Sequence, residues 1–374
     1  MLLHLPCLLS LLSSPCLAQS EVGSLDQLVE SVALSHVEQP EIAEIQRAAV
    51  EGLLLWLERH DGAEHVAVLT RQEHERRMRH AEGDRFGVGI GVLLVPGYGI
   101  RILEVFPGTP ADRAGLETGD VVVAVDGEAV GNRPVTEVAR LLSAYGRPQL
   151  LLEIVDHFGQ PRSLVLAPEA YHAPPVAVSD GEGYRIVRVH HFGKDAAAQI
   201  GAALLELGAE RELVLDLRDV KDGQVTETVG AAAPFLGREQ VACYRSTAGG
   251  RVEPVPAPPA ARWMRPVAVL INGGTEGVAE LFAAMIQRAN PAVTLVGTPT
   301  AGIDALPTWV DLGPDHVLQL PGMRLSLADG TSWGRVGVVP DVVVQPVEGS
   351  QIVPPPAAPA DLQVDAALRV VGGP

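Results

Sequence analysis

A short glycine-bearing turn, residues 272–280, constrains the fold more than any other stretch of the sequence. An uninterrupted apolar run at 267–271 precedes it and is typical of a buried parallel strand. A helical pattern at 281–286 follows it. A strand, a tight turn and a helix start can together present a nucleophile at a sheet edge, where backbone N–H groups stabilise an oxyanion. The turn itself, however, holds Gly277, which has no side chain to react.

Composition narrows the possible partners. The chain has 374 residues, enough for two or three domains, and its hydrophobic fraction of 47% can supply their cores. The net charge of -18 argues against nucleic acid and anionic membrane surfaces as partners. Lysine occurs only at Lys194 and Lys221, so chemistry that depends on lysine has two places available.

The first 18 residues are apolar and lack charged side chains apart from a histidine, and they end in Cys16, Leu17 and Ala18. This pattern predicts a secretory signal peptide at 1–18 and a protein exported to a periplasm or out of the cell, with no membrane span in the mature chain. A lipid anchor at Cys16 is an alternative, but Pro15 stands where a small residue is needed. Cleavage would leave Cys243 as the lone cysteine, which excludes an internal disulfide.

Three further regions can be assigned from periodicity and composition. Residues 19–80 form a predicted helical segment, because apolar residues recur at helical spacing from Ile42 to Leu57; its charged stretch at 73–77 is interpreted as a solvated helix face. Strand and helix patterns alternate over 176–346, which predicts a mainly parallel α/β core. Irregular segments are expected at the linker 168–175 and at 251–266. The remaining 347–374 is a Pro/Ala-rich tail with a short helix at 361–371.

A glycine-rich turn at 85–94 runs into a predicted strand. No lysine follows it, so this turn is better suited to binding a carboxylate than a phosphate. It is followed by Pro107-Gly108-Thr109-Pro110-Ala111, by Ala114-Gly115-Leu116, by Val125-Asp126-Gly127 and by a helix at about 136–144. This order resembles a bacterial PDZ domain, placed at 81–168. The resemblance implies that a peptide C-terminus pairs with strand 90–94 and lays its last side chain against the helix. The implied peptide-binding residues are Gly89, Ile90, Gly91, Val92, Leu94, Val138, Leu141 and Leu142.

The order of signal, helical segment, PDZ domain and α/β core resembles the carboxyl-terminal processing peptidases, or tail-specific proteases. The stretches that carry the resemblance are the PDZ signature, Asp216-Leu217-Arg218, the turn at 272–280, Gly297-Thr298-Pro299-Thr300-Ala301-Gly302 and 337–341. It implies an α/β core of the ClpP/crotonase-like type, preceded by a PDZ β-barrel-like domain and the helical N-terminal segment.

That family uses a serine nucleophile and a lysine base, and neither is present here. The resemblance places Gly277 at the nucleophile position and Ile303 at the base position. A glycine has no oxygen to attack a carbonyl, and an isoleucine cannot accept its proton. We therefore expect a catalytically inactive, exported PDZ protein that binds protein or peptide C-termini as an adaptor, or as the regulator of an active protease.

Alternatives remain open at the same turn. A relocated pair of Thr275 and Lys221 would make the protein an active endopeptidase. Glu276 and Glu280 could act as acid and base, although carboxylates four apart near a helix start more often stabilise its dipole.

Neighbouring histidines at 190 and 191 point to opposite faces of a strand, so no metal site is expected. No nucleotide fingerprint is present, and no cofactor is expected.

Overall fold

The computed structural model describes residues 24–345, apart from 39, 62–65, 96, 143–145, 210, 238–240 and 248, together with residues 361–372. The predicted signal peptide at 1–18 lies outside the described residues. The chain divides into two compact units, residues 1–67 and residues 68–374. In the described ranges, no helix combines the length and apolarity needed to cross a membrane.

The first unit contains the helices α1 (Leu25–Ser35) and α2 (Ile42–Asp61), as the periodicity predicts. The prediction of helix up to residue 80 is wrong at one place, since the strand β1 (Ala67–Thr70) precedes α3 (Arg71–Ala81). Thr70 separates the two elements because its hydroxyl accepts from the Glu73 N–H at 3.2 Å, while the Glu73 carboxylate accepts from the Thr70 N–H at 2.8 Å. This reciprocal capping box fixes the start of α3.

The predicted PDZ region forms an antiparallel sheet in the order β3-β4-β5-β7-β8, with β6 paired to β5. Its elements are β3 (Ile90–Val95), β4 (Gly99–Val105), α4 (Pro110–Arg113), β5 (Val121–Val125), β6 (Glu128–Ala129), α5 (Val135–Leu142), β7 (Leu150–Val155) and β8 (Pro161–Leu166). Ile102, Val122 and Leu152 are fully buried at the centre of its hydrophobic core.

Two short strands, one before this sheet in the sequence and one after it, pair with each other. The strand β2 (Asp84–Gly87) pairs antiparallel with β9 (Glu169–His172). The expectation of an irregular linker at 168–175 is therefore wrong for 169–172. The pairing partner of β9 lies more than eighty residues earlier in the chain, so local turn residues such as Pro168 and Pro174 outweighed it in the sequence pattern.

The α/β core is built on a six-stranded sheet in the order β10-β11-β12-β15-β16-β19. Its strands are β10 (Val176–Gly181), β11 (Tyr184–Val189), β12 (Glu212–Asp216), β15 (Val267–Ile271), β16 (Val293–Gly297) and β19 (Val342–Val343). The pairs from β11 to β19 are parallel, and only β10 joins antiparallel. The predicted mainly parallel sheet is confirmed, and its edge strand β19 spans only Val342–Val343.

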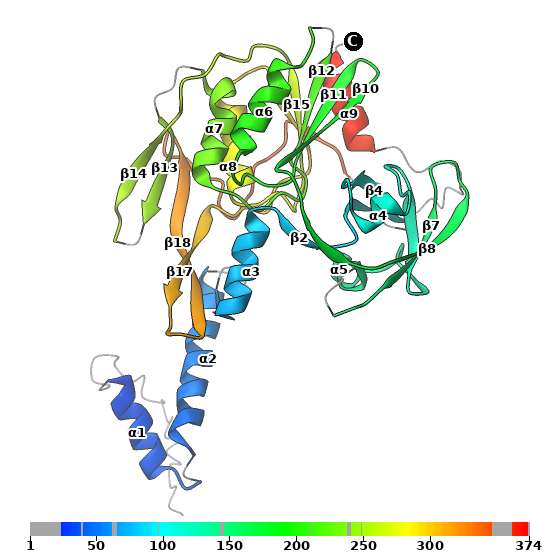
Figure 1. The fold of residues 1–374 in the computed structure, drawn as a ribbon. Coiled ribbons are helices and arrows are strands. Elements are labelled where there is room, and N and C mark those ends of the chain that lie inside the picture. Colours follow the sequence, from blue (N-terminus) through cyan, green and yellow to red (C-terminus); the bar gives the residue numbers. More distant parts are fainter. Residues whose placement is uncertain are drawn as a thin grey trace, which may run out of the picture. The chain divides into compact units, whose positions relative to one another are not determined.

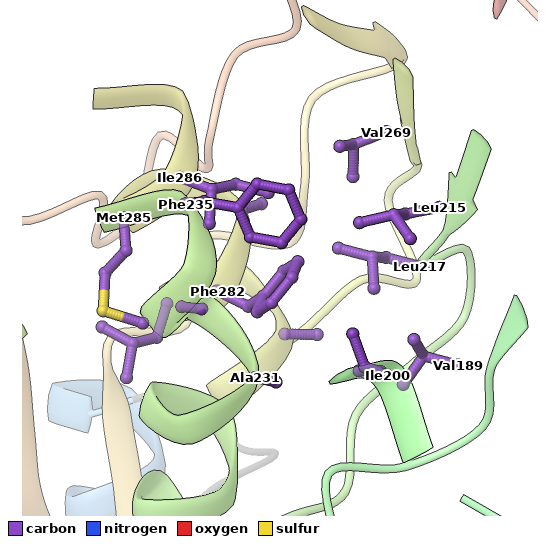
Figure 2. Packing of buried hydrophobic residues seen from close by; sticks show 14 of the residues in the cluster. Val189, Ile200, Leu215, Leu217, Ala231, Phe235, Val269, Phe282, Met285 and Ile286 are labelled. Atoms are coloured by element: carbon purple, nitrogen blue, oxygen red, sulfur yellow. The ribbon is translucent and has the colours of Figure 1, made fainter. Parts of the chain in front are cut away.

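Helices cover both faces of this sheet (Figure 1). One face carries α6 (Ala196–Leu205), α7 (Val225–Leu236) and α8 (Val278–Ala289), and the other carries α9 (Leu362–Gly372). Successive residues of a strand point to opposite faces, so Leu215 packs in the large cluster and Val214 packs toward α9. Figure 2 shows Phe235 of α7 beside Phe282 of α8, with ring centroids 6.2 Å apart.

A second sheet follows the order β1-β18-β13-β14, and β17 also pairs with β18. Its remaining strands are β13 (Val241–Thr247), β14 (Val252–Pro256), β17 (Ala305–Asp311) and β18 (His316–Leu327). The expectation of irregular chain throughout 251–266 is therefore wrong for β14. The two prolines of β14 argue against a strand in the sequence pattern. They are tolerated because β14 is an edge strand, so an N–H on its free side would have no strand partner.

Candidate functional site

The central turn connects the end of β15 to the start of α8, as the sequence predicts. Gly277 is the residue before the helix and has φ +58° and ψ −112°. Residues with a side chain rarely adopt this backbone conformation. The nucleophile of an α/β-hydrolase elbow lies on a similarly strained strand-to-helix turn. A Cβ built on Gly277 would meet Leu306 Cδ2 at 3.4 Å and the Lys221 carbonyl oxygen at 3.8 Å. The position therefore has room for a side chain, and glycine relieves the backbone strain.

Glu280 joins the two positions that the resemblance assigns to the missing dyad. Its Oε2 accepts hydrogen bonds from the Gly277 N–H at 3.0 Å and from the Ile303 N–H at 2.8 Å. Its Oε1 accepts from the Gly302 N–H at 2.7 Å and from the Thr300 hydroxyl. Segments far apart in the sequence are thus held on a single carboxylate. The backbone N–H groups of Gly277 and Ile303 thus converge on Glu280 Oε2.

The Glu280 side chain is fully buried. Burial raises the pKa of its carboxyl group above the ordinary value, while the hydrogen bonds from Thr300, Ile303, Gly302 and Gly277 act in the opposite direction. With three backbone donors and one hydroxyl around it, the carboxylate is fully engaged as an acceptor. It acts as a clamp on the turn, and this geometry leaves it no direct path to a substrate.

Thr275 is fully buried within the turn. Its hydroxyl donates to the Leu217 carbonyl oxygen at 2.9 Å and accepts from the Asn272 N–H at 3.1 Å. The hydroxyl therefore ties the turn to the end of β12, which is the role of a structural hydrogen bond.

Lys221 is half-exposed, and its amine pairs with Glu276 Oε1 at 2.5 Å. The structure thus brings Lys221 to Glu276, and it places the Thr275 hydroxyl against backbone groups instead. Glu276 and Glu280 also diverge, since one binds this amine and the other binds backbone N–H groups.

The loop at 219–223 is fastened to the central turn. Asn272 Oδ1 accepts from the Asp219 N–H at 3.1 Å and from the Gly274 N–H at 3.0 Å. A Cβ on Gly274 would lie 2.2 Å from Asp219 Oδ1 and 3.2 Å from Asp219 Cα, so a side chain there would displace the Asp219 carboxylate. The Glu276 N–H also donates to the Val220 carbonyl at 2.9 Å. Loop and turn therefore form one hydrogen-bonded wall beside Gly277.

A buried cluster of ionised side chains lies at the end of β12, where the chain enters the loop at 219–223. Arg218 contacts Asp216 Oδ2 at 2.7 Å and Asp361 Oδ2 at 2.9 Å, and Arg188 reaches the same Asp216 oxygen at 2.9 Å. Burial acts to raise the pKa of Asp216, but the charges and hydrogen bonds of these arginines hold it below its ordinary value. The cluster links the end of β12 to the start of α9.

The residues expected to bind a peptide in the PDZ domain separate into three groups. Val138 and Leu141 are buried in its hydrophobic core. The partly buried residues around that core are Ile90, Val92, Leu94 and Leu142. The glycines have a steric reason of their own. A Cβ on Gly89 would lie 2.2 Å from Thr109, and one on Gly91 would lie 3.3 Å from Glu104. Peptide binding by these residues stays a prediction.

The adjacent histidines have different partners, and both lie beyond the end of β11, so the strand alternation expected from the sequence does not apply to them. His190 Nε2 lies 2.5 Å from Glu104 Oε2, whereas the buried His191 accepts from the Gly193 N–H through Nδ1 at 3.0 Å. Burial lowers the pKa of His191, and its Nε2 faces the Ala173 carbonyl at 3.3 Å. Within the described residues, no group of three or more His, Cys, Asp or Glu side chains is placed to hold a metal ion.

Comparison with known proteins agrees with this geometry. Residues 183–344 match the model of peptidase family S41, and residues 101–156 match that of the PDZ domain. The chain carries a peptidase family S41 domain preceded by a PDZ domain.

Relatives of this S41 domain protein include bacterial processing proteases. A carboxy-terminal-processing protease of Bartonella bacilliformis is 25% identical over 338 residues, which cover 87% of this chain and 75% of that protein. A carboxyl-terminal-processing protease of Synechocystis is 27% identical over 302 residues, which cover 78% and 69%.

Among solved structures, the photosystem II D1 C-terminal processing protease aligns with a TM-score of 0.50 at 20% identity, over 94% of this chain and 98% of that one. At this identity the likeness concerns the fold. The fold is thus that of S41 processing proteases, with N-terminal helices and a PDZ domain before the α/β core.

Sequence reasoning missed the part that Glu280 plays. The spacing of Gly277 and Glu280 is that of a capping box, in which the third residue of the helix accepts from the residue before it. This signal indicates one of its four hydrogen bonds. The other three come from residues 300–303 and required the tertiary fold.

Proposed function

We propose that this protein is an exported, non-hydrolytic member of the processing-peptidase group. It binds protein C-termini through its PDZ domain and a second peptide segment along the S41 site. It then serves as an adaptor or as the regulator of an active protease.

The convergence of Gly277 and Ile303 on one Glu280 oxygen carries this proposal. A frame that holds both positions supports the assignment of nucleophile and base positions, and neither residue has a group for that chemistry. In a serine protease, loss of one member of the catalytic unit lowers turnover by about 10⁶. Backbone dipoles and binding alone would leave at most a small residual rate.

The engagement of Thr275 and Lys221 argues against relocated catalysis. The Thr275 hydroxyl donates its hydrogen bond to the Leu217 carbonyl, and the Lys221 amine is paired with Glu276. The Lys221 amine therefore donates to Glu276 and the Thr275 hydroxyl donates to a backbone carbonyl, so the two groups are not arranged as base and nucleophile.

Incubation of the purified protein with unstructured substrates of varied C-termini tests the proposal. We expect no turnover by mass spectrometry, and saturable binding of peptides with an apolar last residue. Turnover that is lost in Thr275→Ala or Lys221→Ala would overturn the non-hydrolytic assignment. The Lys194→Ala variant is the matched control, because it removes the other lysine of the chain.

A further inference from the structure

The helix α3 is attached to the hairpin of β17 and β18 in the second sheet. None of its residues is buried. Arg71 donates to the carbonyls of Pro314 at 2.8 Å and Gly313 at 2.9 Å, and Arg77 donates to Gln319 Oε1 at 2.6 Å. A helix that packs on a core through an apolar stripe needs no such contacts. Here polar side chains hold α3 in place.

A hollow of about 300 Å³ lies along this helix. Its lining residues are Leu69, Glu73, Arg76, Arg77 and His80. The last four follow the i, i+3, i+4, i+7 spacing of one helix face. The interpretation of 73–77 as a solvated face is thus incomplete, since this face borders a concave site. The volume is at the small end for ligand pockets, which suits a side chain or two more than a whole peptide.

The charges around the hollow favour an anion. The lining holds one carboxylate and two arginines. The Glu73 carboxylate accepts from both the N–H and the hydroxyl of Thr70 at 2.8 Å, and its charge offsets part of that of Arg76 and Arg77, which leaves an excess of one positive charge. Arg77 has the neutral Gln319 as its partner, so its charge is not compensated by that contact. Arg76 forms no ion pair with any described residue. In a chain of net charge -18, a hollow with two such arginines is a local exception.

His80 connects the hollow to the S41 site. Its Nδ1 lies 3.1 Å from Asp222 Oδ2. Burial acts to raise the pKa of Asp222, but the hydrogen bond and charge of His80 lower it below the ordinary value. An ionised carboxylate can only accept, so the proton of this contact is on Nδ1 of His80. Asp222 is next to Lys221, whose carbonyl is 3.8 Å from a Cβ on Gly277.

We propose that the α3 hollow binds carboxylate groups of a peptide that lies along the vacated S41 site. Arg76 and Arg77 supply the charge, His80 adds a donor beside the loop at 219–223, and Leu69 contacts the methylene groups. The inference rests on the proposed function for the presence of a peptide, and it specifies acidic chemistry for one part of that peptide.

Fluorescence anisotropy with three labelled peptides tests this. The first is short, rich in Asp and Glu, and amidated at its C-terminus, so the PDZ groove finds no free terminus. The second is its Asn and Gln counterpart. The third is a neutral peptide with a free C-terminus and an apolar last residue, which reports on the PDZ domain.

We expect the acidic peptide to bind more tightly than its neutral counterpart, and Arg76→Gln to weaken it by about two- to fivefold, the range of an exposed ion pair. Adding Arg77→Gln should weaken it further. The matched control is Arg79→Gln, on the same helix but outside the lining. Loss of affinity in Arg76→Gln for the third peptide would also support carboxylate binding, with the chain terminus as its source.

Equal binding of the acidic and neutral peptides would overturn the proposal, as would equal weakening by Arg79→Gln and Arg76→Gln, since that indicates diffuse charge. Failure of the PDZ prediction is separate, because it would remove binding of the third peptide and leave the first unchanged. Circular dichroism of each variant verifies that α3 is retained.

Discussion

The backbone conformation of Gly277 predicts that a substitution at this position lowers the free energy of unfolding. With φ +58° and ψ −112°, any side chain at this position is held in a sparsely populated conformation, which costs about 1–3 kcal/mol. The steric contribution is small, because the nearest atoms to a Cβ, in Leu306 and Lys221, lie at 3.4 Å and 3.8 Å. Gly277→Ala and Gly277→Ser should therefore destabilise the S41 domain by about 1–3 kcal/mol.

Thermal unfolding followed by tryptophan fluorescence measures this effect. For a domain of about 150–250 residues, 1 kcal/mol corresponds to about 2–4 °C, so the melting temperature should fall by about 2–12 °C. The matched control is Gly201→Ala in α6, which has nothing within 4 Å of its Cβ and a regular helical backbone. That substitution should stabilise by about 0.5–1 kcal/mol.

The reasoning would be refuted if Gly277→Ala raised the melting temperature as Gly201→Ala does. The result would mean that the turn adopts a relaxed conformation, and that glycine at 277 has no bearing on strain. A fall in both variants would instead point to the loss of glycine flexibility in general, and it too would contradict the argument from the turn.

Three further outcomes are expected. Glu280→Gln should lower the free energy of unfolding by about 2–4 kcal/mol in urea titrations, because one acceptor oxygen is replaced by a donor among buried N–H groups; an unchanged midpoint would contradict the clamp. Asp216 has a folded pKa below its unfolded value, so its stabilisation is present above the unfolded pKa and is lost as pH falls through the folded one. Urea midpoints measured down to about pH 2 should therefore fall less steeply in Asp216→Asn, and parallel curves would argue against it. Burial raises the pKa of the Cys243 thiol to about 11, so in protein lacking residues 1–18 a thiol reagent at neutral pH should label Cys243 only after unfolding, and rapid native labelling would contradict this.

Much of the core could be predicted from sequence, because its signals are local. The apolar run of β15 and the helical pattern of α8 are contiguous, and the structure has both where the pattern places them. The final helix is α9, within a residue of its predicted bounds. The strand β9 was missed because its pairing partner lies more than eighty residues earlier in the chain, and β14 was missed because it contains two proline residues.

The sequence by itself determined that position 277 is glycine and position 303 is isoleucine, and with them which side-chain chemistry is absent. Only the tertiary structure decided that the two lie on one carboxylate, that the Thr275 hydroxyl is bound to Leu217, and that α3 borders a hollow. The physical reason is one of range. Residue identity and periodicity act within a turn or two of chain, whereas the hydrogen bonds that residues 300–303 donate to Glu280 exist only after the sheet and its helices bring those segments together.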